Sequence, residues 1–263
     1  MDLGLKGKIA LVAAASQGLG RAVAEELARE GSSLILCSRG GAPLDAAAES
    51  ICKEFGVPVV AVAADLSETA NVECVVKAGL DRFGRIDILV TNIGGPPAGK
   101  FEDLSSEQWD AAHRLLLTSV LDLTRLVLPG MKERRWGRIL NITSIASKQP
   151  VDNLILSNSL RAAVTGFAKT LANEVAADGV TVNNILPGYT RTERLVDLID
   201  FLAEKENITS DEVKARWESE IPMRRLGEPS EFAALAAFLV SERASYITGS
   251  SIAVDGGLIR SLF

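Results

Sequence analysis

Short apolar runs alternate with amphipathic segments along the 263-residue chain, and this alternation limits the folds open to it. The runs are residues 9–12, 34–37, 57–63 and 86–90. They are apolar throughout rather than at every second position, which is typical of parallel strands covered by helices on both faces. Helices are predicted between them at 18–30, 44–55 and 68–83. The pattern indicates right-handed βαβ units in one doubly wound parallel sheet, an α/β fold of the Rossmann type.

Two long helices are predicted in the second half of the chain. The first begins at Ser105, where Gln108 three residues on completes a capping box, and it runs to about Arg134. The second runs from about Leu154 to Ala177. Apolar residues on more than one face of the first helix exceed what one sheet can cover, which predicts a helix contact with a second subunit. These residues are Leu115, Leu116, Leu117, Val120 and Leu121.

The segment between Thr192 and Leu226 differs in character from the rest of the chain. It is acidic and amphipathic, and Thr209-x-x-Glu212 forms a second capping box, so two short helices outside the sheet are predicted there. Residues 193–226 are expected to form a helical lid over a substrate. No repeat, low-complexity tract or long linker divides the sequence, so residues 1–263 are interpreted as a single domain.

Charge and composition exclude several classes of partner. The formal net charge is −6, which argues against nucleic acid and anionic membrane surfaces. No run of about 18 apolar residues exists, so no membrane span is expected. Cys37, Cys52 and Cys74 form no CxxC pair and are interpreted as small core residues of a cytoplasmic protein. His113, the one histidine, is interpreted as a packing or surface residue, and no metal site is expected.

A glycine turn follows the first strand and opens the first helix. It reads Ala14-Ala15-Ser16-Gln17-Gly18-Leu19-Gly20. Such a turn directs backbone N–H groups and a helix N-terminus at a pyrophosphate, and its glycines let the backbone approach closely. A GxG pair alone is a weak signal, because many plain turns contain one. The turn therefore predicts a nucleotide site only if later segments agree with it.

Five later segments do agree, in order and in spacing. They read Ala64-Asp65-Leu66, Thr91-Asn92-Ile93-Gly94, Asn184-Ile185-Leu186-Pro187-Gly188-Tyr189-Thr190-Arg191-Thr192, Tyr246-Ile247-Thr248-Gly249 and Val254-Asp255-Gly256-Gly257. Together with the glycine turn they resemble the motifs of the short-chain dehydrogenase/reductase family, and within it the 3-oxoacyl-carrier-protein reductase branch. The resemblance covers essentially the whole chain, and the common order of weak motifs makes it specific.

The resemblance implies a nicotinamide cofactor and the residues that hold it. The implied cofactor-binding residues are Ser16, Gly18, Leu19, Gly20, Arg39, Asp65, Leu66, Asn92, Gly94, Arg161, Pro187, Gly188 and Thr192. In the family an aspartate at the position of Asp65 meets the adenine, and the segment that ends at Thr192 lies beside the nicotinamide. Ala14 departs from the family, which has glycine there. It costs little if its φ is negative and strains the turn if its φ is positive.

The residues after the second strand bear on the choice between NAD(H) and NADP(H). A carboxylate there would bind the 2′-OH of NAD and repel the 2′-phosphate of NADP. This chain has Cys37-Ser38-Arg39 and no acid until Asp45. Arg39 can form a fork on a 2′-phosphate or stack on adenine, and a solvated surface arginine is the alternative interpretation. The sequence favours NADP(H).

The resemblance also implies a proton relay, and two of its residues differ here. In the family a serine holds the substrate oxygen, a tyrosine donates or accepts its proton, and a lysine lowers the tyrosine pKa and binds the nicotinamide ribose. Ser144 matches the serine, whereas Ser157 and Arg161 stand at the YxxxK positions of the tyrosine and the lysine. The family's relay asparagine falls at about Leu116. Ser144, Ser157 and Arg161 are the candidate catalytic residues.

These replacements change the proton chemistry that the site can offer. A serine hydroxyl is a far weaker acid than a phenol with a pKa of about 10, and it reaches less far. Arg161 supplies charge and hydrogen bonds but cannot relay a proton, because an arginine pKa lies above about 12. Tyr189 and Lys148 are further relay candidates, with structural packing and a solvated loop as their alternative interpretations.

Two functions are therefore weighed. The first is a divergent NADP(H)-dependent oxidoreductase that acts on a small carbonyl compound or secondary alcohol. The second is a nucleotide-binding sensor or assembly subunit with little or no catalysis. The family resemblance also implies a homotetramer, formed through the long helices and by pairing near residues 246–254.

Overall fold

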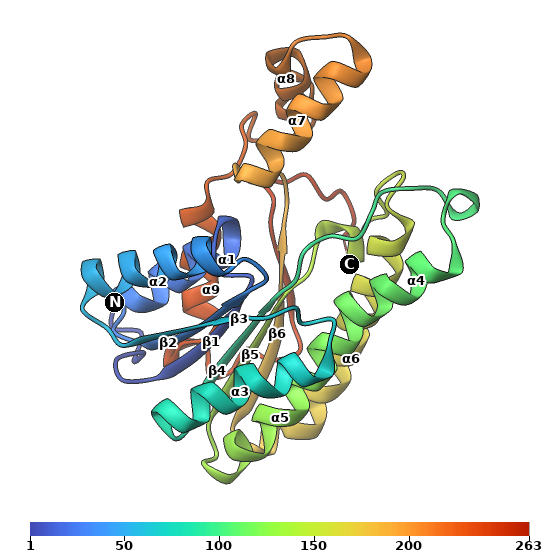
Figure 1. The fold of residues 1–263 in the computed structure, drawn as a ribbon. Coiled ribbons are helices and arrows are strands. Elements are labelled where there is room, and N and C mark those ends of the chain that lie inside the picture. The colour runs from blue at the N-terminus through green and yellow to red at the C-terminus, as the bar shows by residue number, and fades with distance from the viewer. Residues whose placement is uncertain (263) are drawn as a thin grey trace.

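One parallel sheet lies between two layers of helices in the computed structural model, which describes residues 1–262 (Figure 1). Its strand order is β3-β2-β1-β4-β5-β6-β7. The strands are β1 (Ile9–Ala13), β2 (Ser33–Ser38), β3 (Val59–Ala63), β4 (Ile88–Asn92), β5 (Gly137–Ile142), β6 (Val180–Pro187) and β7 (Ser251–Val254). The order reverses between β1 and β4, the point at which such sheets bind ligands. The predicted Rossmann-type α/β fold is confirmed.

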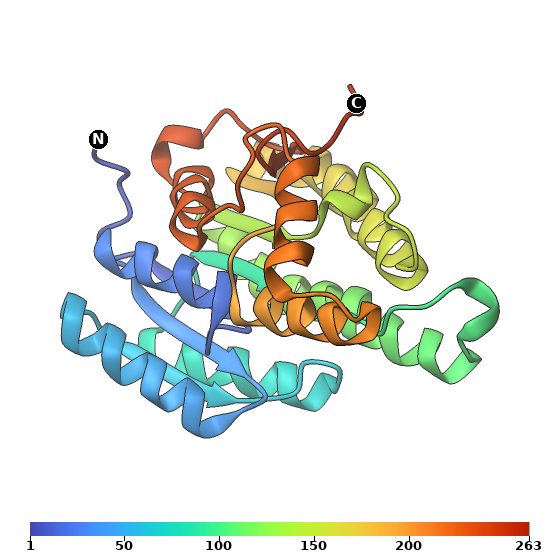
Figure 2. The same cartoon turned by 90° about the horizontal axis from the view of Figure 1, so that it is seen from above.

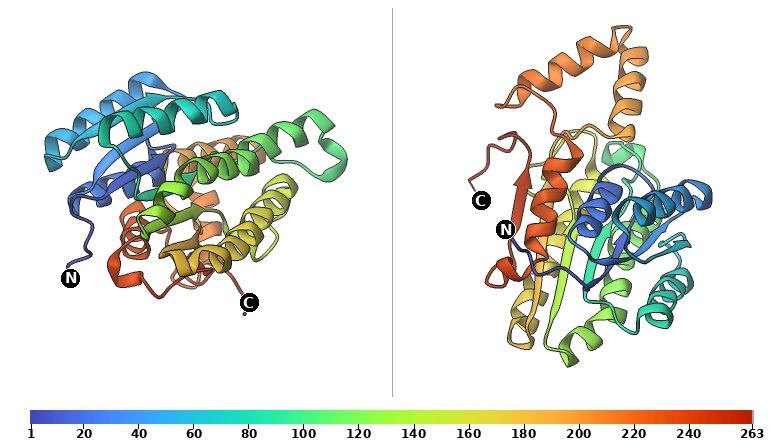
Figure 3. Two further views of the ribbon diagram at one scale, coloured as in Figure 1. Left: turned by 90° about the horizontal axis from the view of Figure 1, so that it is seen from below. Right: turned by 90° about the vertical axis from the view of Figure 1, so that its left-hand side faces the viewer.

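Helices cover both faces of the sheet, because alternate strand residues point to opposite sides. Helices α1, α2 and α9 pack on one face with Val12 and Val90, and α3, α5 and α6 pack on the other with Leu11 and Leu89 (Figures 1 and 3). The helices are α1 (Gly18–Arg29), α2 (Gly41–Phe55), α3 (Thr69–Phe83), α4 (Ser106–His113), α5 (Ser119–Glu133), α6 (Ile155–Val175), α7 (Glu193–Glu206), α8 (Ser210–Glu220) and α9 (Pro229–Leu239).

The long helices predicted in the second half are present with local changes. The first is divided into α4, a π-helical turn at Arg114–Thr118 and α5. Its Ser105–Gln108 capping box is formed in both directions, as predicted. The second is α6, which passes into a 3₁₀ turn at Ala176–Asp178. The π-helical turn is not part of the predicted single helix and is a finding of the structure.

The expectation that all three cysteines are core residues is wrong. Cys37 on β2 is fully buried, and burial raises the pKa of its thiol to about 12. Cys52 and Cys74 are exposed. They lie on the outer sides of α2 and α3, one residue after Ile51 and one before Val75, which are buried against the sheet. A cysteine on an amphipathic helix follows the helix period rather than its own tendency to be buried.

The α7–α8 hairpin, residues 193–220, stands off the carboxyl edge of the sheet (Figures 1 and 3). Its helices pack on each other through Ile199, Ala203, Val213 and Trp217. Seen from above, the hairpin crosses over the region where the strands end (Figure 2). The two helices predicted outside the sheet are thus present, and the Thr209 capping box opens α8.

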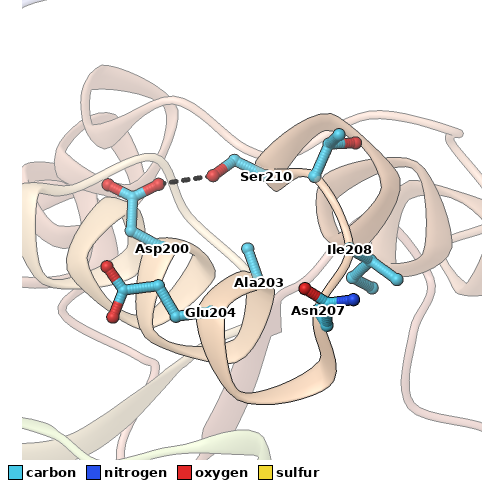
Figure 4. A pocket seen from close by; sticks show the side chains of 7 residues that line it. Asp200, Ala203, Glu204, Asn207, Ile208 and Ser210 are labelled. Carbon is cyan, nitrogen blue, oxygen red and sulfur yellow. Dashed lines mark hydrogen bonds between the residues drawn. The ribbon is translucent and has the colours of Figure 1, made fainter.

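A hollow of about 480 Å³ lies within the hairpin itself (Figure 4). The Ser210 hydroxyl donates a hydrogen bond of 2.7 Å to Asp200 across it and so joins the two helices. The residues that line the hollow all belong to the hairpin or to its connecting loop. None of the residues that the sequence predicts for the site lines it, so the hollow is separate from the strand ends.

Candidate active site at the carboxyl edge of the sheet

The turn between β1 and α1 has almost no free space around Gly20. A Cβ at Gly20 would lie 2.7 Å from the Asn92 side-chain nitrogen and 2.9 Å from the Ala13 carbonyl oxygen. The Asn92 amide donates to the Ala14 carbonyl at 3.5 Å. Ala14 has a φ of 49°, in the left-handed region that strains a residue with a Cβ. The strained alternative for Ala14 is therefore the one that the structure adopts.

The N-terminus of α1 presents backbone N–H groups without a side-chain cap. Gln17 precedes the helix and makes no capping hydrogen bond, and the first turn carries no acid. Across from it, the Thr192 side chain lies 3.6 Å from the position that a Cβ of Gly18 would occupy. Gly18, Thr192 and Arg21 are among the residues around a hollow of about 460 Å³. The turn after β1 and the loop after β6 thus face each other. The uncapped N–H groups suit a bound anion, although a Glu193 carboxylate oxygen also lies 3.7 Å from that Cβ position.

Further along the edge, the predicted adenine and 2′-phosphate residues are neighbours. Asp65 follows β3 and accepts hydrogen bonds from the backbone N–H and the hydroxyl of Ser67, at 3.0 and 2.8 Å. These bonds, and to a lesser extent the charge of Arg39, lower the pKa of the Asp65 carboxyl group. Arg39 is exposed at the end of β2. Leu66 packs its side chain into the core, so its backbone is the part left for a nucleotide.

The loop after β6 is fixed by contact with β7. The Gly188 N–H donates to the Val254 carbonyl at 3.0 Å, and a Cβ at Gly188 would lie 2.7 Å from the Asp255 Cα. Glycine is therefore required there. Pro187 ends β6, and Thr192 accepts a hydrogen bond of 3.4 Å from the Leu195 N–H to cap α7. The loop is thereby held at the edge of the sheet.

Ser144 follows β5 and begins a 3₁₀ turn, Ile145–Ser147, that packs against α6. Its hydroxyl oxygen accepts the Ala146 N–H at 3.1 Å, which leaves the hydroxyl proton free to be donated. The preceding Thr143 hydroxyl is buried and has no hydrogen-bond partner among the described residues. Two hydroxyl groups thus lie at the end of β5, and neither has its hydrogen-bonding capacity filled.

Ser157 lies in the first turn of α6 and is 7% exposed. Its hydroxyl makes no hydrogen bond with residues 1–262. The Ser157 oxygen is not among the buried side-chain atoms that lack a partner, so the hydroxyl reaches solvent and can form a hydrogen bond with a ligand. Ser157 is therefore a polar group with unfilled capacity close to the ends of the strands.

Arg161, one helical turn after Ser157, ties together the ends of two strands. Its Nη1 donates to the carbonyls of Ile142 at 3.1 Å and Thr143 at 2.8 Å, and its Nη2 donates to Ile93 at 3.2 Å. Burial, with a smaller contribution from Arg194, lowers the pKa of Arg161 to about 10. Three of the five N–H groups of this guanidinium thus donate to backbone carbonyls. These three hydrogen bonds are not predicted from the sequence.

Tyr189 and Lys148, the further relay candidates, lie in a packed and a solvated position, respectively. Tyr189 stacks on Trp217 with ring centroids 4.8 Å apart, and burial raises the pKa of its phenol. Lys148 is exposed. Leu116 is buried in the π-helical turn and provides no polar atom to hold a water. His113 is exposed and shares a hydrogen bond of 3.3 Å with Thr118. The ring of Tyr189 thus packs on the α7–α8 hairpin through Trp217.

Arg194, in the first turn of α7, is a residue of this region that the sequence predictions missed. A Cβ at Gly95 would lie 2.6 Å from its Nη1 and 2.7 Å from its Cζ, so the guanidinium rests on the loop after β4. One sequence signal could have drawn attention to it. A cation in the first turn of a helix is disfavoured by the helix dipole, so its presence calls for a further reason.

Metal-binding clusters and membrane spans are both absent from the described residues. Within residues 1–262, no group of three or more His, Cys, Asp or Glu side chains is placed to hold a metal ion. No helix in that part of the chain is long and apolar enough to cross a membrane.

Comparison with known proteins finds similarity along nearly the full length of the chain. Residues 13–259 match the family described as enoyl-(acyl carrier protein) reductase. The 3-oxoacyl-(acyl-carrier-protein) reductase FabG of Vibrio cholerae is 36% identical, over 97% of this chain and 99% of that protein. Oxidoreductase UcpA of Escherichia coli is 37% identical, over 96% and 95%. L-sorbose reductase of Gluconobacter frateurii, solved with NADPH and L-sorbose, has a TM-score of 0.96 at 35% identity and covers 100% of both chains.

Proposed function

The chain belongs to the short-chain dehydrogenase/reductase family, and from this premise we propose that it is a divergent NADP(H)-dependent oxidoreductase acting on a small carbonyl compound or secondary alcohol. One observation carries the proposal: a phosphate-binding turn and a group of unfilled hydroxyls lie at the same edge of the sheet. Gly18 faces Thr192 at the turn. Arg161 ties the strand that leads to Ser144 to the loop after β4.

The cofactor proposed for this edge is NADP(H), in preference to NAD(H). The uncapped N–H groups of α1 and the cradle around Gly20 suit a pyrophosphate. Asp65 would meet the adenine, and the exposed Arg39 beside it would meet the 2′-phosphate. The similar L-sorbose reductase was solved with NADPH. When bound, the nicotinamide supplies the hydride that adds to a carbonyl carbon.

In the proposed site, two serine hydroxyls bind the carbonyl oxygen. Ser144 donates its free proton, because its lone pair already accepts the Ala146 N–H. The Ser157 hydroxyl, which has no partner among residues 1–262, gains one when substrate binds. Neither hydroxyl titrates near neutral pH, so the negative charge on the oxygen is stabilised by hydrogen bonds and by Arg161 until solvent supplies a proton. Since a positioned acid contributes about 10²–10⁴-fold, turnover without one is expected to be slow.

The α7–α8 hairpin and the segment that follows it, residues 193–226, are proposed to cover the substrate. The hairpin begins at the loop after β6, beside the turn that would hold the phosphates. It crosses above the ends of the strands (Figure 2). Closure of such an element would exclude water from the hydroxyls of Ser144 and Ser157.

The proposed assembly is a homotetramer, with a dimer as the minimum. Leu115, Leu117 and Leu121 on the first long helical run are half-buried, and Leu126 is 39% exposed. Tyr246, beside β7, is fully exposed. Burial of these apolar groups between subunits would be favourable. Light scattering should give a mass of four or two chains at micromolar concentration, and a monomer mass would contradict this part of the proposal.

A second candidate function has its own supporting observation. Arg161 commits three N–H groups to backbone carbonyls, and a serine stands where the family has its proton-transferring tyrosine. Both features suit a protein that binds the nucleotide and transmits its presence as a sensor or assembly subunit. Under this alternative, NADPH binding would change the shape or assembly of the protein without any reduction.

The test combines a binding measurement with a turnover measurement. Calorimetry should detect NADPH binding to the purified protein, and loss of NADPH absorbance should be seen with at least one member of a panel of ketones, aldehydes and sugars. Gly20→Ala serves as the control that lacks the cofactor cradle. Clear binding without turnover of any panel member would favour the sensor, and absence of binding would contradict both candidates.

A further inference from the structure

Two arginines converge on the loop of residues 93–95, which follows β4. Arg161 on α6 reaches this loop from one side, through its Nη2 bond to the Ile93 carbonyl at 3.2 Å. The guanidinium of Arg194 on α7 rests on Gly95 of the same loop, where a Cβ would not fit beside it. They are close enough for the charge of Arg194 to contribute to the lowered pKa of Arg161.

Arg194 is exposed, and no side chain in the described part of the chain neutralises its charge. Its neighbour Arg161 repels it, and its position in the first turn of α7 places it against the positive end of the helix dipole. No hydrogen bond or ion pair joins Arg194 to a described residue, 1–262. Other arginines nearby are paired: Arg191 with Glu228 at 3.1 Å, and Arg216 with Glu206 at 2.8 Å. The guanidinium of Arg194 is therefore available to pair with an anion.

The position of Arg194 relates it to the reacting groups rather than to the phosphate-binding turn. Thr192 and Glu193, which precede it, lie beside Gly18 in that turn. Arg194 lies instead at Gly95, on the loop that Arg161 holds. Arg161 also holds the Thr143 carbonyl, directly before Ser144, and lies one helical turn after Ser157 on α6. An anion held by Arg194 would therefore lie near the proposed carbonyl position.

We propose that the substrate is an oxo acid, or the corresponding hydroxy acid, whose carboxylate is bound by Arg194 while its carbonyl or hydroxyl oxygen lies at Ser144 and Ser157. This inference rests on the proposed function and names its substrate class. A guanidinium binds a carboxylate through two parallel N–H···O bonds, which also orients the substrate. The carboxylate is unchanged by the reaction, in which hydride adds to the carbonyl carbon, a proton adds to its oxygen and NADPH becomes NADP⁺.

The test compares oxo acids with their methyl esters, which keep the carbonyl and remove the charge. Pyruvate, acetoacetate and levulinate place the carboxylate at increasing distance from the ketone. The wild-type protein should prefer at least one acid over its ester by about 10-fold or more in kcat/KM, mainly through KM, as expected for loss of a charge-assisted bond. Arg194→Gln should abolish that preference by lowering kcat/KM for the acid to the value for its ester. Arg194→Lys should retain part of it.

Two controls distinguish a carboxylate site at Arg194 from a general effect of charge and from a role in cofactor binding. Arg216→Gln removes a paired arginine of the same hairpin and should leave the acid preference intact. NADPH affinity should be the same in wild type and Arg194→Gln. If Arg194→Gln instead weakens NADPH binding as much as it slows acid turnover, Arg194 serves the cofactor phosphates and the inference is wrong. Equal rates with acids and esters in the wild type would also overturn it.

If no carbonyl compound is turned over at all, the proposed function fails, and binding still tests the inference. Calorimetry of the NADPH-saturated protein with pyruvate, acetoacetate and levulinate should then detect binding of at least one acid by the wild type and none by Arg194→Gln. Absence of acid binding to the wild type would reject the anion site independently of catalysis.

Discussion

The two ends of the site use different parts of the chain. At the phosphate-binding turn, the groups that matter are backbone N–H groups and the absence of a side chain at Gly20. At the reaction end they are side chains, those of Ser144, Ser157 and Arg161. A backbone cradle persists as long as its glycines do, whereas side-chain chemistry changes with a single residue. Nucleotide binding and turnover therefore depend on different residues of this chain. Variants at the turn should change NADPH affinity, and variants at the reaction end should change the turnover rate.

The largest effect is expected at the backbone end. Gly20→Ala should reduce NADPH affinity by about 100-fold, because overpacking costs about 1–3 kcal/mol and the new Cβ would meet Asn92 and the Ala13 carbonyl. Gly166→Ala on α6, where a Cβ has open space, is the matched control and should bind NADPH normally. Calorimetry measures both. Normal binding by Gly20→Ala would mean that the turn does not cradle the cofactor.

The next largest effect is expected at the side-chain end. Ser157→Tyr combined with Arg161→Lys should raise carbonyl reduction by up to about 10²-fold, because a phenol of suitable reach would then donate the proton and lysine would lower its pKa. The gain is limited because Ser157 is 7% exposed and Leu116 leaves no polar atom for a relay water. NADPH affinity should change little.

Two measurements check this second prediction. Ser157→Tyr alone should do less than the pair, since the residues act as a unit. Thermal unfolding should show a loss of stability with Arg161→Lys, because one ammonium group cannot reproduce bonds to Ile142, Thr143 and Ile93 in guanidinium geometry. A double variant slower than a brisk wild type would mean that Ser157 and Arg161 belong to a different working mechanism.

The same division describes what could be predicted from sequence. The sheet and its helices follow from apolar runs and capping residues, and the glycine turn from its spacing, because these are local properties. Cys52 and Cys74 are exposed although the tendency of cysteine to be buried predicts core positions for them. Each follows the period of its amphipathic helix instead. The φ of Ala14 depends on packing at Asn92 and Gly20, which lie apart in sequence, so sequence left both signs open.

Side-chain contacts between residues far apart in the sequence cannot be predicted from local patterns. Arg161 was placed correctly on its helix, yet its bonds to Ile93 and Thr143 depend on how β4, β5 and α6 meet. Arg194 lies about a hundred residues from Gly95, and no local pattern joins them. Such contacts are settled by tertiary packing, and they bear directly on the chemistry of the reaction end.

A smaller effect is expected at the adenine end. Arg39→Ala should remove most of a preference for NADPH over NADH of about 10- to 100-fold, since a charge-assisted bond to the 2′-phosphate contributes about 1.5–3 kcal/mol. Arg82→Ala, an exposed arginine on α3, is the control and should keep the preference. Titration with both cofactors measures it. Equal affinities in the wild type would show that Arg39 is a solvated surface residue.

The smallest effect concerns the strain at Ala14. Ala14→Gly should raise the free energy of unfolding by about 0.5–1 kcal/mol, because glycine adopts a φ of 49° without strain but gains entropy when unfolded. Ala15→Gly, at a buried position without positive φ, should instead lower stability. Urea unfolding distinguishes them. If both glycines destabilise the protein equally, the turn carries no strain at Ala14.

Transfer of hydride is the central claim, and isotope transfer tests it most directly. The protein is incubated with NADPH deuterated at the transferred position and with the panel of oxo acids and neutral ketones, and the alcohols are analysed by mass spectrometry. This detects turnover too slow for absorbance. The account predicts one deuterium on the new carbinol carbon of at least one product, and none with Gly20→Ala. NADPH binding without deuterium in any product would contradict the account and favour the nucleotide-binding sensor.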